Sequence, residues 1–498
     1  MGPLSADELE ALADELGVAV TDAETDELVD AVNGFLDGLD AVDEVAVADD
    51  GPGGERTWRE PTDDPYNAVS YECRVEPAPD NAGALAGVEV GLKDIIAVAG
   101  VPMECGSEVM AGYVPRTDAT VVQRFREAGA TVTAKLNLDE FAGSGRGTTG
   151  RGPPVRNPHD PERTAGGSSG GSAVAVATDR VDVSLGTDTG GSVRIPAGFC
   201  GVVGLKPTYG LVPLSGVVEN TYTQDHVGVF ADATAPVAAA LDAIAGTDPD
   251  DPASLAAAGR DDYECGGYAS AVEDGGPDLD DLEIGVLAEG FGEGVADPVA
   301  ESTRAALDRL ADAGAAVREV SVDGFEYGPA VKNLLSLTEL AVHWRDGAAP
   351  YRRGGVVDDG YQAAFADRTR ASSGDLDTFY KAKLLAGAHV VETHGGRRYT
   401  RAQAVREVLR EEFDAALDGV DALALPTMPD VAPRIEAADD PGFDYARNTR
   451  AANVTRLPAV SLPNGTVDGL PVGFQLMGEA FGERRLLGAA ATVEPHLG

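Results

Sequence analysis

Short apolar stretches alternate with amphipathic helical stretches over most of this chain, and this alternation limits the folds open to it. Apolar and polar residues alternate over residues 88–92 and lead into the apolar run 95–98. Residues 118–128 place apolar side chains on one helical face, and another strand pattern follows at 131–134. The further candidates are strands at 181–185, 283–287, 422–425, 459–462 and 473–477, and helices at 233–245, 302–313 and 401–417. The pattern predicts an α/β fold whose large, mixed, mainly parallel twisted sheet is covered by helices on both faces.

The first 66 residues have a different character from the rest. Ser5 and Glu8 have capping-box spacing, and two helical apolar stripes follow within the first 45 residues. Residues 49–65 are rich in Gly, Pro and acidic residues, which is typical of a linker. We therefore expect a helical extension and linker over 1–66 and a main domain over 67–498. Within that domain, the Asp-, Pro- and Gly-rich stretch 247–281 is expected to be a surface excursion.

The net charge of the chain limits which partners and which environment can be expected. Lys and Arg total 38 against 84 Asp and Glu, so the net charge is −46, and only six of the cations are lysines. Such a charge repels phosphates and anionic lipid, so we expect no nucleic-acid and no membrane partner. An acidic surface that is poor in lysine indicates adaptation to high salt. No signal peptide or membrane-length apolar run is found, which favours the cytoplasm. Four separated cysteines and six scattered histidines give no ligand spacing, so no metal or cofactor is expected.

Two Gly-Gly-Ser turns within 164–210 carry the clearest functional signal. They are Gly166-Gly167-Ser168 and Gly190-Gly191-Ser192, and each precedes a segment that can begin a helix. Glycines there let backbone N–H groups approach a phosphate or an oxyanion. A phosphate loop would need a lysine after the glycines, and none occurs between Lys135 and Lys206. A dinucleotide-binding fingerprint fails as well, because Gly143-Ser144-Gly145 is followed by Thr148 instead of a third glycine.

Serine chemistry remains, with two possible bases. A Gly-x-Ser-x-Gly pattern occurs at 166–170, but the preceding residues cannot form the apolar strand of a nucleophile elbow. Asp225 and His226 would complete a Ser-His-Asp triad only by assumption. A neutral lysine can also activate a serine. Lys93 lies where an alternating strand joins an apolar run, so it is a candidate base, or else an exposed residue or an ion-pair partner of Asp94.

Residues 166–198 closely resemble the signature of the amidase signature family, with Gly-Gly-Ser-Ser-Gly-Gly-Ser followed by Gly-Thr-Asp-x-Gly-Gly-Ser-x-Arg-x-Pro-Ala. The resemblance extends from about residue 67 to the C-terminus, and it includes 91–107, 117–130, 134–142, 204–213, 424–429 and 469–478. Residues 64–79 and the N-terminal helices look similar to bacterial stand-alone enantioselective amidases. One departure is Val229 after Asp225-His226-Val227-Gly228, where the family often has proline.

The resemblance implies a Ser–cis-Ser–Lys triad. Ser192 matches the nucleophile, Ser168 the bridging serine with a cis peptide bond, and Lys93 the general base. The backbone N–H groups of Thr189, Gly190, Gly191 and Ser192 would form the oxyanion hole. Supporting roles fall to Ser169, Asp188 and Arg194.

The resemblance thus implies an amidase that hydrolyses a carboxylic acid amide to the acid and ammonia through an acyl-enzyme on Ser192. We expect a small-molecule amide as its substrate and a homodimer as its assembly. An alternative within the family is the glutaminase subunit of a tRNA-dependent amidotransferase, which passes ammonia to a partner. Outside enzymes, the alternative is a glycine-loop module that binds an anion or a nucleotide.

Overall fold

The computed structural model describes residues 3–44, 56–78, 83–351 and 358–498. It separates into two compact units, 1–50 and 51–498. In the smaller unit, α1 (Ala6–Leu16) and α2 (Thr25–Leu36) are followed by a 3-10 turn over Leu39–Glu44. The predicted capping box is present, since Ser5 and Glu8 cap the start of α1 reciprocally. Asn33 exchanges two hydrogen bonds with the backbone of Leu4, which ties α2 to the start of α1.

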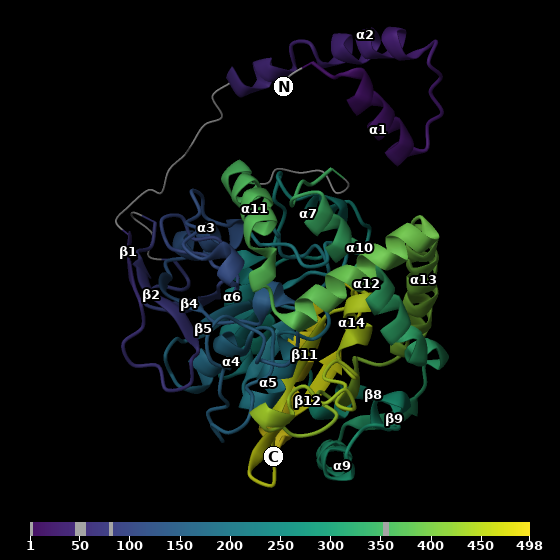
Figure 1. The fold of residues 1–498 in the computed structure, drawn as a ribbon. Coiled ribbons are helices and arrows are strands. Elements are labelled where there is room, and N and C mark those ends of the chain that lie inside the picture. The colour runs from purple at the N-terminus through teal and green to yellow at the C-terminus, as the bar shows by residue number, and fades with distance from the viewer. Residues whose placement is uncertain (1–2, 45–55, 79–82, 352–357) are drawn as a thin grey trace. The chain divides into compact units, whose positions relative to one another are not determined.

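The larger unit is built on one twelve-stranded sheet (Figure 1). The strand order across it is β1-β2-β4-β3-β5-β7-β6-β11-β12-β10-β8-β9. The strands are β1 (Arg56–Arg59), β2 (Val69–Val75), β3 (Glu89–Lys93), β4 (Thr131–Leu136), β5 (Val183–Thr187), β6 (Val203–Lys206), β7 (Val227–Ala231), β8 (Glu283–Leu287), β9 (Ala316–Val320), β10 (Ala422–Pro426), β11 (Ala459–Val467) and β12 (Leu470–Met477).

The sheet is mixed, as predicted, but it is not mainly parallel. Among the described strands, parallel pairing is confined to β4-β3-β5 and β10-β8-β9. All other neighbours are antiparallel. The centre is antiparallel because β11 and β12 form a hairpin and because β7 runs back against both β5 and β6. The local strand patterns in the sequence did not reveal these directions.

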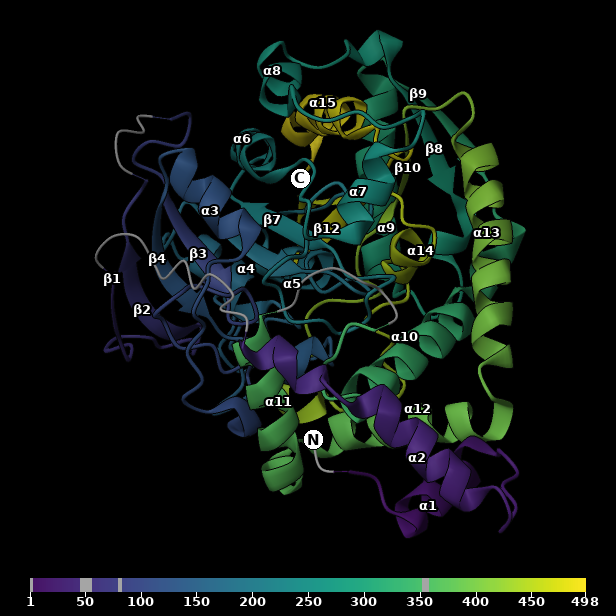
Figure 2. The ribbon, with the colours of Figure 1, turned by 90° about the horizontal axis from the view of Figure 1, so that it is seen from above.

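Helices cover both faces of the sheet, which confirms the predicted fold class (Figure 2). Along β7, Val227 and Val229 pack into a core shared with α3 (Thr120–Glu127) and α6 (Thr234–Ile244). Phe230, which follows Val229, packs on the opposite face with α4 (Gly170–Ala177). Successive strand residues therefore feed separate cores, as the two-residue period of a strand requires. The helix α5 (Arg194–Cys200) packs against β6, β11 and β12.

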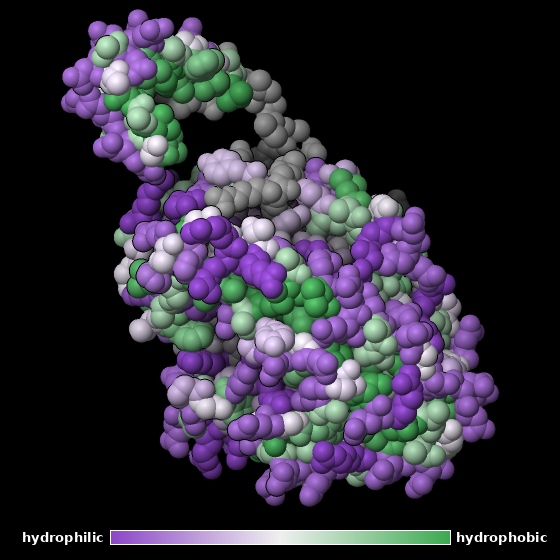
Figure 3. All heavy atoms as spheres, turned by 90° about the vertical axis from the view of Figure 1, so that its right-hand side faces the viewer, coloured by the Kyte–Doolittle hydropathy of each residue, from purple (hydrophilic) through white to green (hydrophobic). Residues whose placement is uncertain are grey.

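A helical layer lies beyond the sheet, where α10 (Gly328–Arg345) packs against α12 (Thr378–His394) and α13 (Arg397–Leu417). Figure 3 shows this side of the molecule, where hydrophilic side chains dominate and hydrophobic ones gather in patches. The remaining helices are α7 (Pro252–Ala258), α8 (Tyr268–Glu273), α9 (Asp297–Asp312), α11 (Asp359–Ser372), α14 (Arg450–Val454) and α15 (Glu483–Val493). None of the helices among the described residues is long and apolar enough to cross a membrane.

Two segments differ from their simple sequence descriptions. The stretch predicted as a linker includes β1, which pairs with β2; the part of it up to residue 55 lies outside the described residues. The stretch 247–281 contains α7 and α8, and Tyr268 of α8 is fully buried in the main core. It is therefore packed by α6 and α15 and is more than a surface loop.

Candidate active site

Lys93 ends β3 and points into the fully buried interior of the larger unit. Its Nζ donates to Ser168 Oγ at 2.7 Å and to Thr187 Oγ1 at 2.8 Å. Strand β3 pairs in parallel with β5, so the ends of the two strands bring Lys93 beside Thr187. The structure thus joins a strand lysine to the first Gly-Gly-Ser turn across 75 residues of sequence.

The surroundings of Lys93 favour its uncharged form. Burial lowers the pKa of Lys93 to about 7, although the carboxylates of Asp139, Asp188 and Asp225 act in the opposite direction. Among the described residues, no carboxylate pairs with Lys93, and both of its close partners are hydroxyls. An amine of this kind can accept a proton near neutral pH, as a general base must.

Ser168 and Ser192 lie on neighbouring loops that each run into a helix. The peptide bond between Gly167 and Ser168 is cis. Ser169 N donates to Ser192 O at 3.2 Å, so the two loops are in direct contact. Ser169 Oγ also exchanges hydrogen bonds of 3.2 Å with the backbone of Thr187, which fixes the first loop to β5. Ser192 opens onto a cavity of about 450 Å³, and among the described hydrogen bonds none joins its Oγ to Ser168 Oγ.

The loop between β5 and α5 presents unpaired backbone N–H groups beside Ser192. Among the described hydrogen bonds, no acceptor is recorded for the N–H groups of Thr189, Gly190 or Ser192. Gly191 is different, because its N–H donates to Asp188 Oδ1 at 2.7 Å. The prediction of four oxyanion-hole donors is therefore corrected to three, since the carboxylate of Asp188 already occupies the Gly191 group. Three donors at a loop beside a serine hydroxyl suit a developing oxyanion.

Gly191 has a positive φ of 129° that side chains other than glycine rarely adopt. A Cβ there would lie 2.1 Å from Thr449 Oγ1, so the close approach of Thr449 also requires glycine. The adjacent Thr189 is held by its hydroxyl, which donates to Asp225 Oδ1 at 2.6 Å. Asp225 Oδ2 in turn accepts from the backbone N–H groups of Asn220 and Thr221, at 2.8 Å each. The loop is thus fixed on both sides of Gly190.

A buried ion pair supports the same loop from behind. Arg194 Nη2 lies 3.0 Å from Asp188 Oδ1, and neither side chain is exposed. Burial alone would raise the pKa of Asp188, but the charge and hydrogen bonds of Arg194 and the amide of Asn453 hold it below its ordinary value. Arg194 also donates to the backbone oxygen of Thr449 and to Gln475 Oε1, at 2.8 Å each. The supporting roles expected of Asp188 and Arg194 thus have a clear geometric basis.

The site cavity also contains two lysines that the sequence analysis did not select. Lys332 of α10 and Lys383 of α12 line it together with Ser192. The sequence analysis missed them because they lie on separate helices, far along the chain from the glycine loops, and belong to no motif. The scarcity of lysine in the chain was the one signal that could have pointed to them.

The structure does not support two other interpretations of the sequence, an ion pair between Lys93 and Asp94 and a triad that includes His226. Asp94 pairs with Lys135, 2.7 Å away in the interior, so Lys93 is not its partner. His226 Nδ1 lies 2.7 Å from the backbone oxygen of Gln224 and 3.0 Å from that of Asp188, and no described hydrogen bond joins it to a serine. The structure therefore assembles no Ser-His-Asp triad from His226. Among the described residues, no cluster of three or more His, Cys, Asp or Glu could hold a metal ion.

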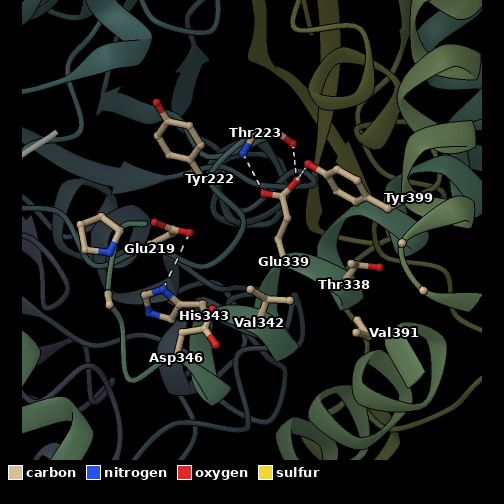
Figure 4. Close-up of a pocket in the computed structure, with 14 residues that line it drawn as sticks. Glu219, Tyr222, Thr223, Thr338, Glu339, Val342, His343, Asp346, Val391 and Tyr399 are labelled. Carbon is tan, nitrogen blue, oxygen red and sulfur yellow. Dashed lines mark hydrogen bonds and ion pairs between the residues drawn. The ribbon is translucent and has the colours of Figure 1, made fainter. Parts of the chain in front are cut away.

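A second cavity, of about 530 Å³, lies between α10 and the start of α13 (Figure 4). Glu339 points into it and accepts hydrogen bonds from Thr223 and from Tyr399 Oη, while His343 faces Glu219 at 3.8 Å. Neither Lys93 nor the two serines line this cavity. It is separate from the site that contains Ser192.

Comparison with known proteins identifies the family. The family described as Amidase matches residues 68–487. The chain belongs to the amidase signature family. One subunit of the glutamyl-tRNA(Gln) amidotransferase of Halobacterium salinarum is 41% identical over 436 residues, covering 86% of this chain and 99% of that protein. The corresponding protein of Haloarcula marismortui is 40% identical over 435 residues, with the same coverage.

Solved structures give the same family. The matching subunit of the Thermotoga maritima glutamyl-tRNA(Gln) amidotransferase superposes with a TM-score of 0.71 at 30% identity, over 86% of this chain and 87% of that subunit. The peptide amidase of Stenotrophomonas maltophilia gives 0.70 at 34% identity, over 83% of each chain. These likenesses support amide C–N hydrolysis as the general chemistry.

The comparisons correct the expected partners. We predicted a homodimer that acts on a small-molecule amide and has no nucleic-acid partner. The curated relatives are instead named as one subunit of a glutamyl-tRNA(Gln) amidotransferase. The net charge of a single chain therefore does not exclude a relation to a tRNA-directed enzyme.

Proposed function

We propose that this amidase is the ammonia-producing subunit of a tRNA-dependent amidotransferase, with Ser192 as its nucleophile. The observation that carries the chemistry is the contact between the buried amine of Lys93 and Ser168 Oγ, next to the loop that bears Ser192. The support for a place in an amidotransferase is that the likeness to the halophilic amidotransferase proteins extends over 99% of their length.

The reaction begins with a proton transfer. Neutral Lys93 takes the proton of Ser168, Ser168 takes that of Ser192, and Ser192 Oγ attacks the amide carbonyl of glutamine. This relay requires Ser192 Oγ to move within hydrogen-bond reach of Ser168, and such contacts often tighten only when substrate binds. The proton then returns along the same path to the leaving nitrogen, which departs as ammonia. Water hydrolyses the acyl-enzyme to glutamate.

The N–H groups of Thr189, Gly190 and Ser192 stabilise the negative oxygen that forms during the attack. Removing one such donor typically costs an enzyme about 3 kcal/mol of transition-state stabilisation. The ion pair behind the loop and the bond from Thr189 to Asp225 keep these donors in place before substrate arrives. The preorganised loop therefore accounts for a large part of the rate acceleration.

Reconstitution tests the proposal directly. The purified chain would replace its relative in the Halobacterium salinarum amidotransferase, and the conversion of glutamyl-tRNA to glutaminyl-tRNA would be measured in molar KCl with glutamine as the nitrogen donor. We expect amidated tRNA with the native chain and none with Ser192→Ala. Glutamine hydrolysis that never yields amidated tRNA in the reconstituted mixture would contradict this role in an amidotransferase.

A second candidate is carboxamide hydrolysis by the chain acting without partner subunits. It is favoured by the 34% identity to the Stenotrophomonas maltophilia peptide amidase, and the likeness to stand-alone enantioselective amidases belongs with it. A panel of aliphatic, aryl and amino-acid amides separates the two candidates. Efficient ammonia release from several neutral amides, and little from glutamine, would favour this second function.

A further inference from the structure

The cavity that contains Ser192 is lined by two lysine side chains that have no carboxylate partner among the described residues. Lys332 and Lys383 line the cavity. Among the described residues, no Asp or Glu oxygen lies within 4.0 Å of either Nζ, whereas Lys135 in the same protein has such a partner at 2.7 Å. Lys383 Nζ donates to the backbone oxygen of Gly143 at 2.8 Å, which leaves donor capacity on its ammonium.

Lys332 is placed against the loop that would hold the oxyanion. A Cβ built on Gly190 would lie 3.0 Å from Lys332 Cε and 3.7 Å from its Nζ. The side chain thus lies over Gly190, two residues before Ser192. A group bound by this ammonium would belong to the same molecule whose carbonyl reaches Ser192.

The carboxylates that act on these lysines through space are already hydrogen-bonded to other groups, and one of them, Asp444, itself lines the cavity. Asp225 accepts hydrogen bonds from Thr189, Asn220 and Thr221, and Asp444 is bonded to Arg450. These groups influence the lysines through space without neutralising them at contact distance.

The lowered pKa values of the two lysines also favour a site for an anion. Burial lowers the pKa of Lys332 to about 8, with a further contribution from Arg450 against the opposing carboxylates of Asp225 and Asp444. Burial lowers the pKa of Lys383 to about 7, and repulsion by Lys332 adds to it against Asp225 and Asp139. A bound carboxylate would favour the charged form of both amines and would offset part of the cost of burial and of their mutual repulsion.

Lysine is rare in this chain, which makes the presence of two lysines in one cavity unusual. Six lysines stand against thirty-two arginines in this chain, and two of the six line one cavity. A salt-adapted surface does not explain them, because they line the site of the nucleophile.

We propose that Lys332 and Lys383 form an anion-binding subsite that selects amides carrying a carboxylate on the acyl side. This inference rests on the proposed function in one respect, since it takes Ser192 as the nucleophile. Glutamine is one member of the class, and ω-amides of simple dicarboxylic acids are others. The carboxylate replaces water around the two ammonium groups and fixes the position of the carbonyl.

Paired substrates test the subsite in the full-length chain. Oxamate, malonamate, succinamate and glutaramate would each be compared with the neutral amide of the same chain length, and kcat/KM would be measured by ammonia release. We expect the native chain to prefer the carboxylate member at one spacing. Lys332→Met and Lys383→Met should each lower kcat/KM for that carboxylate amide by about tenfold to hundredfold, the usual effect of losing a charged hydrogen bond. The loss on the neutral amide should be clearly smaller, so that the preference for the carboxylate member falls.

Lys381→Met is the matched control, because Lys381 is also on α12 but donates to the backbone oxygen of Gly374 and does not line the cavity. It should retain the carboxylate preference, and Lys332→Arg should retain much of it. Labelling of Ser192 by phenylmethanesulfonyl fluoride, a neutral probe, reports whether each variant keeps its fold and nucleophile.

The outcomes separate this inference from the proposed function. If Ser192 is labelled normally and the Met variants keep the native carboxylate preference, or the native chain has none, the subsite is wrong. The subsite is also wrong if the Met variants lose activity equally on charged and neutral amides. Failure of the native chain to label at Ser192, with amide turnover intact, would instead contradict the proposed nucleophile.

Discussion

Lys93 Nζ lies 2.7 Å from Ser168 Oγ in an interior where neither side chain is exposed to solvent. In the proposed mechanism, this contact sets the pH range in which the enzyme can work. Lysine is a base only when it is uncharged, and burial lowers the pKa of Lys93 to about 7. Below that value the ammonium predominates and cannot accept a proton from Ser168.

The first prediction is therefore a rise of kcat with pH through an apparent pKa of about 7, reaching a plateau above it. The measurement is ammonia release across the pH range at saturating amide in constant salt. A profile that stays flat into acid pH would exclude a lysine base. Lys93→Met should lower kcat by about 10²-fold to 10⁴-fold, the usual contribution of a general base, and circular dichroism should be unchanged.

Breaking the ion pair behind the loop should destabilise the protein. Asp188→Asn leaves the guanidinium of Arg194 buried without a counter-charge, and losses of about 3–5 kcal/mol are typical of such changes. The free energy of unfolding would be measured by denaturant titration in high salt. Asp262→Asn is the control, because Asp262 pairs with Arg260 at the surface and should cost about 1 kcal/mol or less. Equal losses in both variants would contradict the structural role given to Asp188.

Gly191→Ala should disable catalysis more than it disturbs the fold. The substitution strains a backbone at φ 129° and places a methyl group against Thr449 Oγ1, so the loop must shift. A displacement of about 1 Å can cost about 10²-fold in rate, and we expect a loss of at least that order in kcat/KM. Gly374→Ala, where a Cβ meets nothing within 4 Å and φ is unrestrictive, should keep native activity. Native activity in Gly191→Ala would show that the loop geometry is not needed.

The sequence predicted much of this site because its chemistry is concentrated in two short loops. Ser168, Ser192 and Lys93 were selected from the glycine turns and the strand lysine, and the structure places Lys93 beside Ser168. The sequence could not show which backbone N–H groups are free to bind an oxyanion. The N–H of Gly191 is not free because the side chain of Asp188 folds back onto its own loop and accepts a hydrogen bond from it.

Long-range contacts account for what sequence reasoning missed. The strand pattern gave β3, β8 and β10 closely, yet β7 was overlooked, although Val227–Ala231 occupies the centre of the sheet. The expectation that the mixed sheet would be mainly parallel was wrong, because strand direction depends on which strands pair and not on local periodicity. Lys332 and Lys383 come together in the site because α10 packs against α12, and no sequence motif predicts that packing.

Salt should be required for stability. A net charge of −46 is strongly self-repulsive at low ionic strength, and counterions relieve that repulsion as the screening length shortens. We expect the thermal midpoint to fall steadily as KCl is removed, with unfolding before the lowest salt is reached. Scans in KCl and in an osmotically matched sucrose series separate screening from crowding. A midpoint independent of KCl would contradict salt adaptation.

The proposed mechanism requires Ser192 to become covalently acylated. The most direct measurement is intact and peptide mass spectrometry of the protein quenched during turnover of a slowly hydrolysed amide. We predict an adduct with the mass of the acyl group on the peptide that contains Ser192, absent from Ser192→Ala and retained in slowed form in Ser168→Ala. Amide turnover in Ser192→Ala at the native rate, or an acyl adduct on another residue, would contradict the mechanism.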